Sequence, residues 1–180
     1  MATLEQIDPE DFLAISADVA YVYGVAMQRP AEIVIQRREL LATHVAYPGF
    51  IAAGIVDVDP GRTPPRQLLG FGYGYRGAPG QWWHDIVATA LGPDGAVRWL
   101  RNGFELAELH VLPEHHGRGY GGALLADIMI RANAAHIVLS TPDIDSPARA
   151  LYRSRGFTDL RTGFRFPGSG EDYAIMGRDL

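Results

Sequence analysis

Three side chains that can take up a proton lie close together in the middle of the chain: Glu105, Glu108 and His110. They stand among Phe, Leu, Ala and Val in residues 104–111, a run that predicts a strand. Burial or a nearby like charge raises the pKa of a glutamate from about 4.3 toward neutrality, where it becomes an effective general base. The run therefore indicates proton transfer. Strand alternation separates Glu105 from Glu108 unless a bulge intervenes, so the sequence leaves open which residue is the base.

A glycine-rich loop follows this strand and precedes a predicted helix. Four of the six residues 117–122 are glycine, and apolar residues then recur at helical spacing. The first N–H groups of a helix have no internal partner, and the helix dipole makes that end electropositive. Glycine permits positive φ and lets a diphosphate approach the backbone closely. Strand, loop and helix together predict a phosphate-binding site.

Two other phosphate-binding motifs do not fit the loop. A P-loop requires Gly-Lys-Ser/Thr, and this chain contains no lysine. A dinucleotide fingerprint places its strand directly before the first glycine, with an acidic residue about 20 positions later. Here the interval between strand and glycine is too long and the strand is too acidic.

The loop resembles motif A of the GCN5-related N-acetyltransferases, Gln/Arg-x-x-Gly-x-Gly/Ala. The matching residues, in order, are His116, Gly117, Arg118, Gly119, Tyr120 and Gly121. Both motif glycines are present, and His116 stands where the family carries Gln or Arg.

A second segment, residues 146–157, resembles motif B of the same family, Asn-x-x-x-x-Leu-Tyr-x-x-x-Gly-Phe. Leu151-Tyr152 and Gly156-Phe157 match, and Ser146 replaces the asparagine. The two motifs occur in the family's order and at its separation. The resemblance covers about residues 50–166 well and both ends loosely.

The resemblance implies an α/β (α+β) fold, a splayed mixed sheet of about seven strands flanked by helices, in one acetyltransferase domain spanning residues 1–180. Acetyl-CoA, the implied co-substrate, would lie where the sheet splays. Its pantetheine arm would bond to the backbone of Leu109, His110 and Val111, and its diphosphate would sit on the loop. Ser146 is implied as a further cofactor-binding residue.

The resemblance also implies the catalytic groups. In this family the acetyl group passes directly to an amine, so the absence of a cysteine nucleophile is no obstacle. Glu105 stands where the histone-acetylating members carry their glutamate, and Glu108 and His110 are alternatives. Tyr152 falls on the tyrosine that donates to the CoA sulfur, although it could instead be a core residue. Backbone N–H groups near Val111 are expected to stabilise the oxyanion.

The implied activity is N-acetylation of an unidentified small-molecule or peptide amine, and two other classes stay open. A non-catalytic acyl-CoA-binding or sensing module would bind CoA without turnover and would tolerate loss of Tyr152. A nucleotide-binding protein would use the loop for another phosphate and would not need the pantetheine arm. Many relatives are homodimers, so a homodimer is a further expectation from the resemblance.

Composition indicates which binding partners and which cellular compartment to expect. The formal charge of −5 and the pI near 5.6 argue against a nucleic-acid partner or an anionic membrane. The N-terminal residues have no basic and apolar signal pattern, and no apolar run approaches a membrane span, so a cytoplasmic protein is expected. The histidines and acids have no metal-ligand spacing, so no metal is predicted. His136, before a short apolar run, is expected to be structural.

The surrounding elements follow from periodicity and from proline and glycine. Helices are predicted at 9–27, from Pro30 to Pro48, at 81–91 (closed by Gly92 to Gly95) and at 146–155, and strands at 50–58, 68–75, 136–140, 159–166 and 173–178. In the second helix Arg37 is expected on the outer face. Either glutamate of the central strand could pair with an arginine such as Arg98 or Arg101. One of the adjacent Trp82 and Trp83 is expected to line a pocket or a subunit contact.

Overall fold

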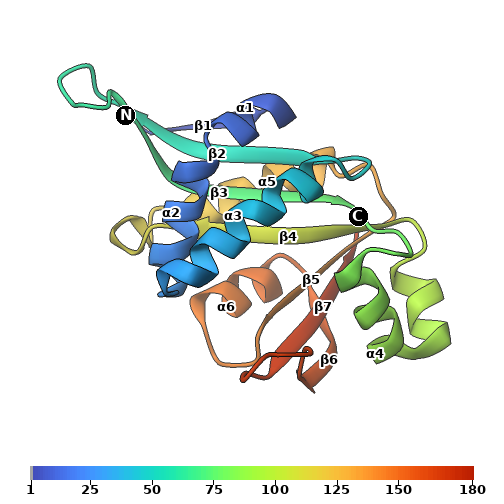
Figure 1. Cartoon of the computed structure of the whole chain (residues 1–180). Coiled ribbons are helices and arrows are strands. Elements are labelled where there is room, and N and C mark those ends of the chain that lie inside the picture. The colour runs from blue at the N-terminus through green and yellow to red at the C-terminus, as the bar shows by residue number, and fades with distance from the viewer. Residues whose placement is uncertain (1) are drawn as a thin grey trace. The chain divides into compact units, whose positions relative to one another are not determined.

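The computed structural model describes residues 2–180 and contains six α-helices and seven strands over that range (Figure 1). In chain order the elements are β1 (Thr3–Ile7), α1 (Pro9–Ala14), α2 (Ser16–Met27), α3 (Ala31–Val45), β2 (Ile51–Val58), β3 (Arg66–Arg76), α4 (Trp82–Trp99), β4 (Gly103–Val111), the 3-10 turn η1 (Pro113–His115), α5 (Tyr120–Arg131), β5 (His136–Pro142), α6 (Pro147–Ser154), β6 (Thr158–Phe164) and β7 (Tyr173–Asp179).

The strands form a mixed sheet in the order β1-β2-β3-β4-β5-β7-β6. β4 and β5 are parallel and pair at three positions, from Gly103 opposite His136 to Glu105 opposite Val138. The β1–β2, β2–β3, β5–β7 and β6–β7 pairs are antiparallel. The predicted mixed sheet of about seven strands flanked by helices is therefore confirmed.

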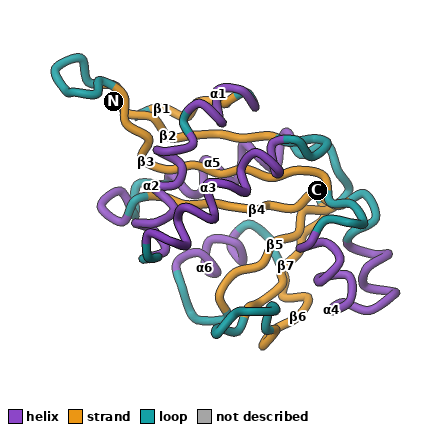
Figure 2. The backbone as a smooth tube through the Cα atoms, viewed as in Figure 1, coloured by secondary structure: helices purple, strands orange, loops and turns teal. Residues whose placement is uncertain are grey.

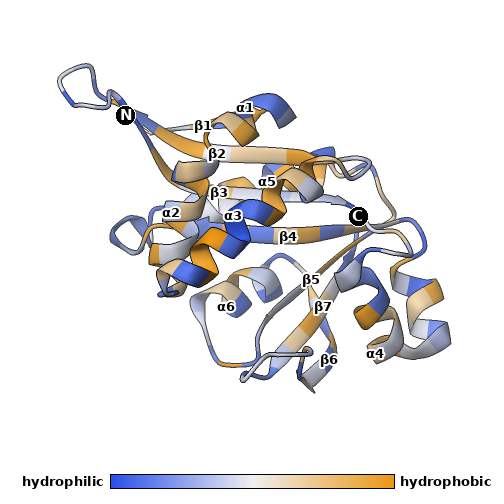
Figure 3. Cartoon of the chain, in the orientation of Figure 1, coloured by the Kyte–Doolittle hydropathy of each residue, from blue (hydrophilic) through white to orange (hydrophobic). Residues whose placement is uncertain are grey.

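The chain folds as two compact units. The first runs through Tyr75 and also includes Glu108–Arg131; the second comprises Arg76–Ala107 and Ala132–Leu180. Strand β4 contributes its first five residues to the second unit and its last four to the first. The central strand therefore supplies polar residues to both units, and Figure 3 shows hydrophilic and hydrophobic segments along it.

In the first unit, alternating aromatics and glycines along β3 give the strand two different faces. The ring of Phe12, from α1, lies 6.3 Å from the Phe71 ring and 5.3 Å from the Tyr73 ring. On the other face, a Cβ at Gly72 would lie 2.8 Å from Cδ1 of Ile128 in α5. Helix α5 thus packs directly on the glycine face, and Phe12 of α1 packs on the aromatic one.

The second unit has a core of its own. Its buried members, from α4, β5, β7 and the connections beside them, are Val87, Leu100, Val138, Phe166 and Ile175. At the start of β5, Nδ1 of His136 lies 2.7 Å from Asp179, and Arg98 donates to the same carboxylate at 2.8 and 2.9 Å. The expectation that His136 is a structural residue with satisfied partners is confirmed.

Three elements differ from the sequence-based prediction. Strand β1 was not predicted; it pairs with β2 from Thr3 opposite Val56 to Ile7 opposite Ala52. The first helix is two helices, because Ile15 leaves the helical region at φ −94° and ψ 18°. Helix α4 does not end at Gly92: that residue makes a kink at φ 72°, and Pro93 begins a second helical segment that runs to Trp99.

The β2–β3 connection is a loop, as predicted, and Figure 2 shows it extending past the ends of both strands. Among residues 2–180, no helix is both long and apolar enough to cross a membrane. The same residues hold no group of three or more His, Cys, Asp and Glu side chains placed to bind a metal ion.

Candidate functional site

The glycine loop lies at the N-terminus of α5 in the first unit. Gly117 and Gly119 have φ values of 76° and 81°, in the left-handed region that favours glycine. A Cβ on either residue would meet no atom within 4 Å, so this side of the loop is open. Across the described chain, the N–H groups of residues 117–122 reach no backbone carbonyl, and the first to do so is that of Ala123, bonded to Gly119 O at 3.0 Å. Open space and free donors are what a bound diphosphate requires.

His116 anchors this loop to the end of β4. Its Nε2 lies 2.9 Å from the carbonyl oxygen of Val111, and because a carbonyl only accepts, Nε2 carries the proton and donates it. The side chain at the first motif position therefore makes an internal bond. Arg118, in the same loop, is exposed and offers a positive charge beside the N–H groups.

A buried polar cluster in the first unit brings together two of the predicted site residues. Oε2 of Glu108 lies 2.5 Å from Nε2 of His110, and Oε1 lies 3.0 Å from a guanidinium nitrogen of Arg37. The side chains of Glu108 and His110 are 10% and 12% exposed. Arg37 comes from α3 and also lies over the ring of Tyr23, 5.1 Å from its centre. Arg37, Glu108 and His110 therefore form one chain of polar contacts, with Glu108 in the middle.

The charges of this cluster decide the ionisation of Glu108. Burial acts to raise its pKa, but the positive charge of Arg37 and the hydrogen bond and charge of His110 outweigh burial and hold the pKa below its ordinary value. In return the charge of Glu108 raises the pKa of Arg37, against the effect of burial. At neutral pH the pair is therefore a carboxylate and a guanidinium. A carboxyl with a lowered pKa is a weak base, which argues against Glu108 itself taking the proton.

A second histidine borders the cluster. Nδ1 of His44 lies 3.0 Å from the hydroxyl of Tyr73, and the imidazole stacks on Tyr47 at 5.9 Å. Burial lowers the pKa of His44 to about 4, with Glu108 opposing and Arg37 adding to the effect. His44 is therefore neutral at physiological pH and contributes no charge to its neighbours.

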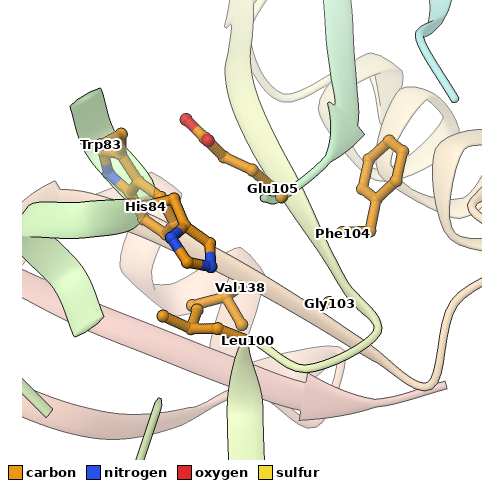
Figure 4. A pocket seen from close by; sticks show the side chains of 8 residues that line it. Trp83, His84, Leu100, Gly103, Phe104, Glu105 and Val138 are labelled. Carbon is orange, nitrogen blue, oxygen red and sulfur yellow. The ribbon is translucent and has the colours of Figure 1, made fainter. Parts of the chain in front are cut away.

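Glu105 lies in the second unit, where its side chain lines a small pocket (Figure 4). The other lining residues come from α4, β4, β5 and their connections, and are Gly77, Trp83, His84, Leu100, Gly103, Phe104 and Val138. Glu105 is 5% exposed. Figure 4 shows its carboxylate on the side of Trp83, with the ring of Phe104 pointing the other way.

The two adjacent tryptophans have separate environments. Trp83 lines the pocket, and its indole N–H donates to Ser140 at 2.9 Å, which fixes the ring. Trp82 is 61% exposed and lies against Phe166 at 5.9 Å between ring centres. The prediction that one of them lines a pocket is confirmed.

Helix α6 of the second unit carries the motif B residues. Ser146 is the N-cap, as predicted, and its hydroxyl oxygen accepts the N–H of Arg149 at 3.2 Å. Tyr152 is 6% exposed and packs on Phe157, with 5.6 Å between ring centres. The cap and the packing fix where both side chains lie; their roles toward CoA stay predictions.

The structure adds Arg37 to the buried polar cluster, although the sequence analysis placed this residue on the outer face of its helix. The expectation that Arg37 points outward is wrong, because its guanidinium turns in to Glu108. Arg98, suggested as a partner for the glutamates, pairs with Asp179 instead. Leu109 and Val111 pack against the first unit's core, so they offer a ligand their backbone. Helical spacing alone gave no signal for Arg37, because its partners Glu108 and Tyr23 come from β4 and α2, outside its own helix.

Comparisons with known proteins identify the family and agree with the fold. A family model described as an acetyltransferase (GNAT) domain matches residues 81–159. The GCN5-like protein acetyltransferase Rv2170 of Mycobacterium tuberculosis is 34% identical over 98% of this chain and 97% of its own length. Two solved structures share the fold at 16% identity and a TM-score of 0.65. They are the ribosomal-protein-S18-alanine N-acetyltransferase of Escherichia coli (99% of this chain, 94% of that one) and Arabidopsis thaliana NAA60 with acetyl-CoA (100% and 99%).

Proposed function

The chain belongs to the GCN5-related N-acetyltransferase (GNAT) family, and from this premise we propose that it transfers an acetyl group from acetyl-CoA to an amine of a protein or peptide. Family membership supports an acyltransferase that uses acetyl-CoA. The choice of a protein amine rests on the 34% identical relative, which is named a protein acetyltransferase.

The observation that carries the proposal is the open loop at the start of α5. Its glycines at positive φ, the unbonded N–H groups and the exposed Arg118 fit a diphosphate. The loop follows β4 after the 3-10 turn η1 in the first unit, so a pantetheine arm leading from the diphosphate would run beside the backbone of Leu109 and Val111. The same strand carries the proton-accepting groups.

Direct transfer fits the residues present. An ammonium group loses two protons on becoming an amide N–H: one restores the thiol of CoA and the other passes to solvent. The nitrogen lone pair forms the C–N bond as the C–S bond breaks and its electron pair leaves with sulfur. The chain has no cysteine to form an acyl-enzyme, and the amine attacks the thioester itself. We assign oxyanion stabilisation to backbone N–H groups near Val111.

The test is a turnover assay on the purified protein. Acetyl-CoA would be incubated with lysine-bearing peptides and, separately, with lysine-free peptides that have a free N-terminus. We expect thiol release that depends on the peptide, with a mass gain of one acetyl group on the product. Acetyl-CoA binding without thiol release in either set would contradict the proposal and favour an acyl-CoA-binding module.

Replacing Tyr152 by phenylalanine tests the proposed donor to the departing thiolate. We expect kcat to fall about 10²-fold with little change in KM for acetyl-CoA, because the lost hydrogen bond acts on charge that develops in the transition state. Tyr173→Phe, in the same unit, is the matched control and should leave kcat near wild type. An unchanged kcat in Tyr152→Phe would make Tyr152 a core residue only.

A further inference from the structure

We infer that His110 is the proton acceptor of the reaction, through its Nδ1 atom, and that Glu108 and Arg37 are positioning residues that prepare it. This inference rests on the proposed function and names which of the candidate bases acts. It stands on three contacts of the first unit: Arg37 to Glu108 at 3.0 Å, Glu108 to His110 at 2.5 Å, and Arg37 over the ring of Tyr23.

The contact with Glu108 selects the tautomer of His110. An ionised carboxylate can only accept, so the Nε2 atom that it contacts must carry the proton. In the neutral imidazole the lone pair then lies on Nδ1. Within residues 2–180, no hydrogen bond engages Nδ1 of His110. The pair therefore presents one basic nitrogen of fixed identity.

Packing fixes the orientation of the imidazole as well. The His110 ring meets Tyr23 edge-on at 5.4 Å and lies 5.6 Å from the Phe71 ring. Tyr23 and Phe71 are 4% and 1% exposed, so both rings are held in place by the residues packed around them. A base held between two buried rings and a carboxylate loses little orientational entropy when it reacts.

Arg37 keeps the pair in the state that can accept a proton. Its positive charge holds Glu108 ionised against the effect of burial, so the carboxylate accepts the Nε2–H of His110. The other titratable groups around the pair are His44 on α3, which is neutral, Tyr23 on α2 and Tyr73 on β3. Among the described residues around Glu108 and His110, Arg37 is therefore the one neighbour that carries a positive charge.

The proton-transfer step balances without any further reagent. Nδ1 takes one proton from the ammonium group of the acceptor, leaving a neutral amine and an imidazolium paired with Glu108. The amine then attacks the thioester as described above. The imidazolium returns its proton to solvent after each turnover, so the cluster ends in its starting state.

The second unit offers a matched control cluster. Arg98, Asp179 and His136 repeat the sequence of arginine, carboxylate and imidazole, with distances of 2.8 Å and 2.7 Å to the carboxylate. That cluster lies at the joined ends of β5 and β7 in the second unit, where His136 pairs with Asp179. Substitutions there impose a similar chemical change without touching the proposed base.

The deciding experiment compares His110→Gln with His136→Gln and Glu105→Gln in the turnover assay, with acetyl-CoA binding measured by calorimetry on each. We expect His110→Gln to lower kcat/KM about 10²–10³-fold with binding retained, and His136→Gln to stay near wild type. A His110→Gln enzyme within threefold of wild type, or a loss confined to Glu105→Gln, would overturn the inference while leaving the proposed function standing. A wild type that binds acetyl-CoA but transfers nothing would overturn both.

Arg37→Gln separates a positioning role from a purely structural one. Without the guanidinium, burial acts on Glu108 with less opposition and the pKa of that carboxyl should rise, so the acid limb of the kcat/KM profile should move upward in pH. Arg37→Lys should restore much of the wild-type profile, and Arg98→Gln should not shift it. Nitrogen NMR of the wild-type imidazole should report a protonated Nε2 and a bare Nδ1. An unshifted acid limb in Arg37→Gln, or the opposite tautomer, would refute the positioning role.

Discussion

Gly119→Glu is expected to weaken acetyl-CoA binding at least about 100-fold, because it places a carboxylate where the diphosphate would lie. Like charges brought together on desolvated surfaces cost several kcal/mol, and each 1.4 kcal/mol is about tenfold in affinity. A Cβ added at this residue would have no atom within 4 Å, so the new side chain would fill the ligand's volume and not a core.

Gly168→Glu is the matched control for the same measurement. Gly168 has φ 79° and also has nothing within 4 Å of an added Cβ, so the backbone strain and the added charge are alike. Gly119→Gln then distinguishes charge from bulk. Calorimetry that finds wild-type affinity in Gly119→Glu, with both variants folded, would remove the loop from the acyl-CoA site.

Arg149→Ala is expected to lower the free energy of unfolding by about 3 kcal/mol, because it breaks a buried ion-pair network. The Arg149 side chain is 8% exposed and bridges Asp143 and Asp159, to which it donates twice at 2.9 Å. Asp143 also accepts the N–H of Gly163 at 2.7 Å. Removing the guanidinium leaves the partly buried Asp143 without its counter-charge and leaves Asp159 with the exposed Arg153 alone.

Arg153→Ala is the comparison that isolates burial. Arg153 lies on the same helix and donates to the same Asp159 at 2.9 Å, but its side chain is 51% exposed. Exposed pairs contribute about 0–1 kcal/mol, so this variant should unfold close to wild type. Denaturant titrations of the three proteins give the difference directly. Equal losses in both variants, or a loss below about 1 kcal/mol in Arg149→Ala, would mean that the buried network does not stabilise α6.

Local sequence determined the elements that carry the proposed phosphate site. Positive φ in the loop was predicted from residue type alone, and Gly117 and Gly119 both adopt it. Ser146-Pro147 predicted the start of α6, and the Ser146 side chain caps it. These features depend on neighbours a few residues apart, where backbone sterics and unsatisfied N–H groups dominate the choice of conformation.

Longer-range features were missed for a common physical reason. Strand β1 is short and half-exposed, and it exists because its backbone pairs with β2. Arg37 was assigned to solvent from helical spacing, yet its guanidinium reaches Glu108. No local pattern distinguishes a surface arginine from one that compensates a buried carboxylate, because the partner is supplied by a distant segment.

The sequence by itself therefore determined that Glu105, Glu108 and His110 share one strand, which precedes a glycine-rich loop. Only the tertiary structure assigned them different surroundings. Glu108 contacts both Arg37 and His110 in the first unit, while Glu105 lines a pocket beside Trp83 in the second. The chemistry of an ionisable group depends on the charges and the burial around it, and packing sets both.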